Sequence, residues 1–277
     1  MRIAPEEKGE IARAGGRRTA GEAPMSSVTI GFSVAILTFA SGFIGLTLQK
    51  SLPEKYTTDH SSDTIKAVLA LVTLLSALVL GLLIWTSYGV YTAQRTAVQT
   101  FAAHVLQLDI ALADLGADAA PARAALKDEI VRTHDEFWGN NNTDFMARNY
   151  SASRANMLAR KHFLQEMHPA NDTQKQALIA AQQETTTIWQ TRLLMSFQLD
   201  DPVSWPLLTI VISWTLLLFC GYGLTSRMNA MTISTIAFGA IAVASAAYLI
   251  VDLSEPYTGL FRVSPAALER VIGDLGK

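Results

Sequence analysis

Four long stretches of this chain contain no Asp, Glu, Lys, Arg or His. They are Val28 to Leu48, Ala67 to Thr86, Pro206 to Leu224 and Met231 to Val251. Each has about 20 predominantly apolar residues, the length of helix that crosses the hydrocarbon core of a bilayer. Buried helices of soluble proteins are usually shorter or have a polar face, so we predict four transmembrane helices.

The composition agrees with an integral membrane protein. The chain is 50% hydrophobic and 17% charged, whereas a soluble domain has about 25% charged residues. A net charge of -2 gives no reason to expect nucleic acid as a partner. The single cysteine, Cys220, lies within an apolar run, so neither a disulfide framework nor a cysteine metal cluster is expected, and no cofactor is predicted.

The four spans form two pairs, residues 25–86 and 206–251, separated by a polar block at 87–205. Residues 1–24 are rich in Gly, Ala, Arg and Glu, so we expect a disordered leader and a translation start at Met25. Residues 252–277 are predicted to form an interfacial elbow followed by a short helix. The predicted fold class is an all-α membrane protein with a helical bundle inserted between two pairs of spans.

The polar block is predicted to be helical throughout. Its first part has apolar residues at alternating steps of three and four, which is typical of a coiled-coil seam. The seam residues are Val98, Phe101, Val105, Leu108, Leu112 and Leu115. We expect one helix to run from the second span to Gly116 and another to begin near Pro121. Two more helices are expected at about 145–167 and 173–199, the last capped by Asp172.

An even number of crossings places both termini and the polar block on the same side of the membrane. Basic residues near the spans decide which side that is. The block side has Arg95, Arg192, Arg262 and Arg270, and the opposite side has Lys50, Lys55, Lys66 and Arg227. This count is a tie, and only the arginines of the leader favour a cytoplasmic block in a multi-pass protein of the cell membrane.

Motifs of common enzymes do not occur in this sequence. There is no P-loop, Gly-rich dinucleotide fingerprint or G-x-S-x-G elbow. His162 and His168 are six residues apart, so they do not share a helical face as a zinc-binding pair does. The spans contain no Asp, Glu, Lys, Arg or His, so a proton relay is not expected either. We therefore predict no enzyme.

Three dispersed segments and the opening stretch resemble a known family. The segments are "SLPEKYTTDHSSDTIKAVLALVTLLSALVLGLL" (51–83), "LDIALADLGADAAPARAAL" (108–126) and "GYGLTSRMNA" (221–230). From about Met25 to the carboxyl end, the chain is similar to the prokaryotic four-helix membrane family of unknown function called bestrophin-like. Bestrophins are oligomeric ion channels with four membrane helices per subunit and a helical cytoplasmic part, so the resemblance implies a homo-oligomeric channel by analogy.

Two features of animal bestrophins have no counterpart here. Their calcium-binding acidic run is absent, because the densest acidic spots are pairs such as Asp128-Glu129 and Asp200-Asp201. Their aromatic or aliphatic neck does not align with the second span. Calcium gating is therefore not carried over. Two functions remain open: an oligomeric ion channel, or a membrane-anchored scaffold or signalling protein whose bundle binds a cytoplasmic partner.

If subunits form a ring, the second span is the best candidate to line the pore. The side chains that share one face of this helix are Leu69, Thr73, Ser76, Leu80, Leu83 and Ser87. Thr73 and Ser76 would offer hydroxyl groups to an ion, and Leu80 and Leu83 would form an apolar constriction that gates by dewetting. The helix continues into the seam, which is a candidate contact between subunits. The alternative is that this face is ordinary packing between helices.

Small residues in the spans are predicted to let helices approach closely. Gly42 and Gly45 lie on a small-residue stripe of the first span, and Ala77 and Gly81 form a small-xxx-small pair in the second. Packing within one chain and contact between chains both explain such stripes.

The segment after the fourth span changes character within a few residues. Asp252 is expected to end the span, and Pro256 and Gly259 to turn the chain. We expect Leu260, Phe261 and Val263 to lie among lipid headgroups. Arg262 would then face lipid phosphate. Ser264 is expected to cap a short helix that starts at Pro265. A simple membrane exit and a gating role are both open for this elbow.

Overall fold

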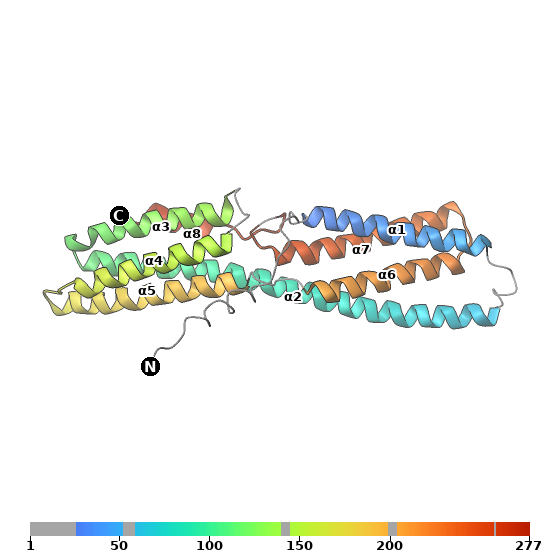
Figure 1. Ribbon diagram of the computed structural model, residues 1–277, viewed down its shortest axis with the longest axis horizontal. Coiled ribbons are helices and arrows are strands. Elements are labelled where there is room, and N and C mark those ends of the chain that lie inside the picture. Colours follow the sequence, from blue (N-terminus) through green and yellow to red (C-terminus); the bar gives the residue numbers. More distant parts are fainter. Residues whose placement is uncertain (1–25, 52–58, 140–144, 199–203, 258) are drawn as a thin grey trace, which may run out of the picture.

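The computed structural model describes residues 26–51, 59–139, 145–198, 204–257 and 259–277. Within these ranges the chain contains helices and no strand, which confirms the predicted all-α class. The predicted leader lies outside the described residues. Figure 1 shows an elongated molecule with two halves, and one helix, α2, runs through both of them.

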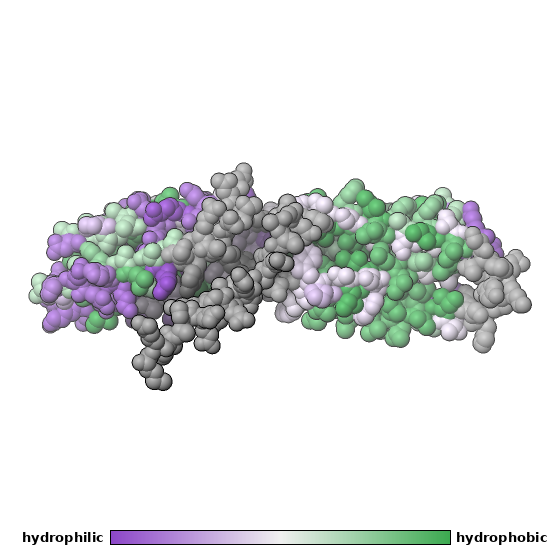
Figure 2. All heavy atoms as spheres, viewed as in Figure 1, coloured by the Kyte–Doolittle hydropathy of each residue, from purple (hydrophilic) through white to green (hydrophobic). Residues whose placement is uncertain are grey.

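The membrane half consists of α1 (Ser27–Ser51), α6 (Trp205–Thr225), α7 (Ala230–Ser254) and the first part of α2 (Asp59–Asp114). All four helices are long and apolar enough to span a membrane, as predicted. Helix α1 packs on α6 and α7, and α2 also packs on α6 and α7. Figure 2 shows that this half is largely covered by hydrophobic residues, which is the surface expected of helices that face lipid.

The other half is a bundle formed by the second part of α2 with α3 (Ala120–Trp138), α4 (Phe145–Glu166), α5 (Asp172–Gln198) and α8 (Ala266–Asp274). A short 3-10 turn, Ala117–Ala119, links α2 to α3. It follows Gly116, whose φ of 92° lies in the left-handed region that glycine adopts without strain. The predicted end of α2 and start of α3 are confirmed.

Two details of the bundle differ from the sequence-based expectation. The amide oxygen of Asn171, not Asp172, caps α5 by accepting a hydrogen bond from the Gln174 backbone N–H at 2.8 Å. The seam residues from Val98 to Leu115 are buried within one chain, in a core shared with α3, α5 and α8. The seam residues therefore pack within the chain's own bundle.

Candidate functional site

Helix α2 has a covered and an uncovered face within the membrane half. Leu69, Ser76, Leu83 and Ser87 are buried on the side that packs on α6 and α7. A Cβ placed on Gly221 of α6 would lie 2.5 Å from Leu69 Cδ2, so these helices are in close contact. The Ser254 hydroxyl of α7 donates a hydrogen bond to Ser87 Oγ at 3.1 Å. This face is therefore occupied by the chain itself.

The opposite face of α2 carries large apolar side chains that point away from the chain. Leu74, Leu78 and Leu82 recur every four residues and are 69%, 70% and 56% exposed. Ala77 and Gly81 are also exposed, and a Cβ added at Gly81 would meet no atom of the described residues within 4 Å. This surface is free to contact lipid, another subunit or a pore.

The predicted pore residues are distributed over the border between these faces. Ser76 and Leu83 are buried, Leu80 is half-buried and Thr73 is exposed. Thr73 Oγ1 lies 2.8 Å from the hydroxyl of Tyr222 in α6. The assignment of these four residues to a pore stays a prediction, because a single chain does not define a path between chains. The burial of Ser76 and Leu83 fits the packing alternative.

The predicted small residues of α1 lie at the tightest helix contacts of the membrane half. A Cβ on Gly45 would lie 2.2 Å from the backbone oxygen of Cys220 in α6. A Cβ on Gly223 would lie 2.4 Å from the backbone oxygen of Gly42. A Cβ on Gly42 would also meet Ile236 of α7. Glycine therefore lets the backbones of α1 and α6 touch. Ala77 and Gly81 of α2, in contrast, lie on the uncovered face and make no such contact within the described part of the chain.

A buried carboxylate holds the membrane half to the elbow. Asp252, near the end of α7, is 1% exposed. It accepts hydrogen bonds from the Ser27 hydroxyl at 2.9 Å and from the backbone N–H groups of Leu260 and Phe261 at 3.2 and 2.8 Å. These donors satisfy the carboxylate without a metal ion. Asp252 therefore joins the start of α1, the end of α7 and the elbow.

The elbow has the two turn residues that the sequence indicates. The backbone oxygen of Pro256 accepts a hydrogen bond from Val263 N–H at 2.7 Å, which closes the loop. Gly259 has a φ of 76°, and a Cβ there would lie 2.0 Å from Asp252 Oδ1. Leu260 and Phe261 are exposed, as membrane-facing residues are. The expectation for Val263 is wrong, because this side chain is 1% exposed and packs in the bundle core.

Helix α8 starts one residue later than expected. Pro265 precedes its first residue, Ala266, and the Pro265 backbone oxygen accepts hydrogen bonds from Leu268 and Glu269 N–H groups. Ser264 Oγ accepts only a longer hydrogen bond, 3.3 Å, from Ala266 N–H. Helix ends defined by different criteria commonly differ by this amount.

A second polar contact joins the elbow to the bundle. Gln94 of α2 is fully buried; its side-chain amide donates to the Met195 backbone oxygen at 3.1 Å and accepts from the Tyr257 hydroxyl at 2.7 Å. Burial raises the pKa of Tyr257, so this phenol stays protonated and remains a donor. The Trp138 indole N–H donates to the Val263 backbone oxygen at 2.8 Å. Gln94 and Asp252 together fix the boundary between the two halves.

The bundle also buries an ion network that the sequence did not indicate. Arg160 of α4 donates to Glu129 of α3, and Arg192 of α5 lies 3.6 Å from Glu129 and 3.1 Å from Glu136. Burial lowers the pKa of Arg192, and the nearby carboxylates oppose that effect. Two positive and two negative charges balance one another, so the network links three helices. In the sequence, the network is indicated only by Glu129, an acidic residue that lies next to Ile130 on the buried side of α3.

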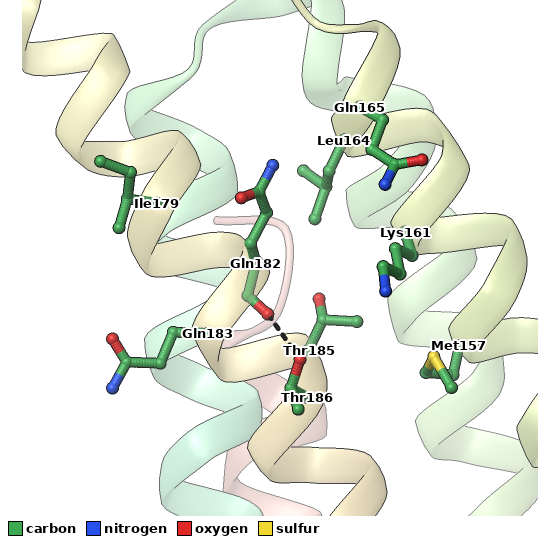
Figure 3. Close-up of a pocket in the computed structure, with 9 residues that line it drawn as sticks. All are labelled: Met157, Lys161, Leu164, Gln165, Ile179, Gln182, Gln183, Thr185 and Thr186. Atoms are coloured by element: carbon green, nitrogen blue, oxygen red, sulfur yellow. Dashed lines mark hydrogen bonds between the residues drawn. The ribbon is translucent and has the colours of Figure 1, made fainter.

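A surface groove of about 370 Å³ lies between α4 and α5. Figure 3 shows Lys161 and Gln165 of α4 on one side and Gln182 and Thr185 of α5 on the other. The Thr185 hydroxyl is buried and has no hydrogen-bond partner among the described residues. The groove therefore has a mixed polar and apolar lining, with one buried hydroxyl group that lacks a partner among the described residues. Among all the residues that the structure describes, no three His, Cys, Asp or Glu side chains lie close enough together to bind a metal ion.

The sequence profile of the bestrophin-like domain matches residues 36–268, a range that begins within α1 and ends at the start of α8, so it includes α2, α6, α7 and the elbow. The chain belongs to the bestrophin-like family. It is accordingly a bestrophin-type membrane protein, as the dispersed sequence segments had indicated. No curated protein matches the chain.

Solved structures agree with this family assignment at the level of the fold. The bestrophin-like chain is similar to a bacterial bestrophin homologue from Klebsiella pneumoniae, whose crystal structure with one point mutation has a TM-score of 0.65 and 14% identity. That similarity covers 92% of this chain and 98% of the homologue. A second mutant structure from Klebsiella pneumoniae has a TM-score of 0.60 and 15% identity, covering 88% of this chain and 97% of the other.

Proposed function

We propose that the chain is one subunit of a homo-oligomeric ion channel in which α2 lines the path for ions. The observation that carries this proposal is the uncovered face of α2, where Leu74, Leu78 and Leu82 point outward while the other face packs on α6 and α7. Ala77 and Gly81, at the edge of that face, suit close contact with a neighbouring subunit. Membership of the bestrophin-like family supports a channel by analogy.

Two sets of residues are candidates for an apolar constriction. The sequence-based set is Leu80 and Leu83, with Thr73 and Ser76 as hydroxyl ligands. Leu83 is buried within the chain, whereas Leu74 and Leu78 are open. We therefore place the constriction at Leu74 and Leu78, where leucine side chains from several subunits would exclude water from a narrow path.

Recordings of purified protein in planar bilayers test this proposal. Leu74→Ser/Leu78→Ser is expected to raise the ion current, because a wetted constriction no longer blocks. Leu80→Ser/Leu83→Ser is the matched variant, which we expect to lower the amount of folded protein without raising the current. A higher current from the second variant alone would instead favour the sequence-based set. No current from the wild type or from either folded variant would contradict the channel.

A membrane-anchored scaffold is the second candidate function. The groove between α4 and α5 favours it, because Lys161 and several amide and hydroxyl groups line an open surface suited to a polar partner. Images of single particles in detergent separate the two functions. A closed ring with a continuous central path supports the channel, whereas a monomer or a dimer without a path supports the scaffold.

We further propose that the bundle and both termini face the cytoplasm. The arginines of the leader support this orientation. Cysteine labelling in intact cells, in a Cys220→Ala background, tests it at two exposed positions. An impermeant reagent is expected to label Arg227→Cys, between α6 and α7, and to spare Asp118→Cys in the bundle. The reverse pattern would mean the opposite topology.

A further inference from the structure

A second hollow of about 370 Å³ lies at the end of the bundle that adjoins the membrane half. Residues of α2, the elbow and α8 line it. Three of these are arginines, Arg95, Arg262 and Arg270, and none of the lining residues is acidic. The hydroxyl-bearing side chains of Tyr91 and Ser264 also line it. The hollow therefore combines a strong positive charge with hydrogen-bond donors.

These arginines differ from the arginines inside the bundle. Arg123 binds Asp109, and Arg160 and Arg192 share Glu129. In the described part of the chain, Arg95, Arg262 and Arg270 form no ion pair or hydrogen bond with another side chain. Glu269 precedes Arg270, but its carboxylate lies 3.5 Å from His134 Nε2 and does not line the hollow. Three uncompensated charges thus surround one space.

The hollow lies within reach of lipid headgroups. Trp85, Tyr88 and Trp205 are at least half exposed near the bundle end of the membrane half, where aromatic side chains mark the membrane interface. Arg95 follows Tyr88 by seven residues, or about 10 Å of helix, and the headgroup layer is about 5–8 Å thick. An arginine side chain can extend across the remaining distance.

The elbow supports the same placement. Leu260 and Phe261 are 75% and 44% exposed and directly precede Arg262. Two large apolar side chains on a loop beside membrane helices are suited to insertion among lipid headgroups. Their insertion would hold Arg262 at the level of lipid phosphate groups.

We infer that this hollow is a phosphate site that binds the headgroup of an anionic lipid or a free phosphate. Guanidinium groups match phosphate oxygens with pairs of parallel hydrogen bonds, so Arg95, Arg262 and Arg270 are the principal ligands. Ser264 Oγ accepts from Ala266 N–H at 3.3 Å, which leaves its hydroxyl proton free to donate. This site does not depend on whether the protein conducts ions.

The experiment uses full-length protein in a neutral detergent, with bound lipid counted by native mass spectrometry. The probes are dioctanoyl phosphatidylglycerol, dioctanoyl phosphatidylcholine and inorganic phosphate. Arg95→Gln/Arg270→Gln is expected to weaken phosphatidylglycerol binding about 25-fold, since each basic residue near an anionic surface contributes about fivefold. Arg262→Gln is expected to weaken it by a further factor of about five.

The matched control is Arg132→Gln/Arg154→Gln, which removes the same charge from two exposed bundle positions outside the hollow. It is expected to bind phosphatidylglycerol as the wild type does, and thermal unfolding without lipid checks that every variant is folded. Binding of phosphatidylglycerol that phosphate displaces identifies a lipid headgroup as the source. Binding of phosphate without phosphatidylglycerol identifies a soluble phosphate. Equal binding of both lipids, equal losses in both double variants, or no binding of any probe would overturn the site.

Discussion

The membrane half and the bundle half both consist of packed helices, yet different contacts hold the helices together in each. In the membrane half, Gly45 and Gly223 bring two backbones into contact, and large apolar side chains point outward. In the bundle, leucine side chains fill the centre, and Glu129, Arg160 and Arg192 are paired inside. Lipid is as apolar as leucine, so close fit must replace the hydrophobic effect as the source of stability in the membrane.

The largest effect is expected where the bundle buries charge. Arg160→Met leaves the Glu129 carboxylate with only Arg192 at 3.6 Å. Removing one partner of a buried ion pair costs about 3–5 kcal/mol, and we expect the lower end because Arg192 remains. The free energy of unfolding in detergent measures this loss. Lys175→Met, which breaks the exposed pair with Asp172, is the control and is expected to change stability by less than about 1 kcal/mol.

A smaller effect, dependent on pH, is expected at Asp109 of α2. Arg123 donates two hydrogen bonds to this carboxylate, at 2.8 and 2.7 Å, and thereby lowers the pKa of Asp109. The stabilisation is complete above the ordinary aspartate pKa of about 3.9 and is lost as the pH falls through the lower folded value. Asp109→Asn is expected to cost about 1.5–3 kcal/mol at pH 7.

Thermal unfolding from pH 7 to pH 2 checks this prediction. The difference between the wild type and Asp109→Asn should shrink as the solution becomes acidic below about pH 4. Asp114→Asn controls for the loss of an exposed carboxylate on the same helix. A difference that stays constant over the whole range would mean that Asp109 stabilises the bundle by some means other than its charge.

A steric effect is expected where α1 and α6 touch in the membrane half. Gly223→Ala places a methyl group 2.4 Å from the Gly42 backbone oxygen, and the backbone cannot move aside as a side chain can. We expect a loss of about 1–3 kcal/mol, the usual cost of overpacking. Gly81→Ala is the matched control, because its methyl group meets no described atom. If Gly81→Ala were the more damaging variant in the assembled protein, the uncovered face of α2 would have to be in contact with another subunit.

The smallest effect is expected for a hydrogen bond within the membrane. Thr73 Oγ1 lies 2.8 Å from the Tyr222 hydroxyl, and such bonds contribute about 0.6 kcal/mol on average. A double-mutant cycle with Thr73→Val and Tyr222→Phe measures this coupling through unfolding in detergent. A coupling energy near zero would mean that Thr73 satisfies its hydroxyl through the Leu69 backbone oxygen alone.

The sequence predicts the helices better than the contacts between them. Charge-free runs gave the four spans, and Gly116 and Pro121 gave the break between α2 and α3. The spans are apolar on every side, so periodicity does not distinguish Leu83, which packs on the chain, from Leu78, which points away. A pattern based on the apolar side of a helix also overlooks a buried Glu129, whose partners are far away along the chain.

The elbow illustrates the same limit. Pro256 and Gly259 predict a turn. In the structure the turn surrounds the Asp252 carboxylate, which accepts hydrogen bonds from the Ser27 hydroxyl and from backbone N–H groups of the loop. Those donors belong to backbone groups and to a serine 225 residues away, which no local pattern reveals. The local pattern of apolar residues likewise predicts Val263 at the membrane surface, although its side chain packs in the bundle core.

The unbroken course of α2 has a mechanical consequence. Its 56 residues extend for about 84 Å without a proline that would weaken the backbone ladder. Such a rod acts as a lever arm: a tilt of about 5° about its midpoint moves each tip sideways by about 4 Å, in opposite directions. A force applied to the outer end of the bundle would therefore reach the far side of the membrane as a displacement, with no loop in between to absorb it.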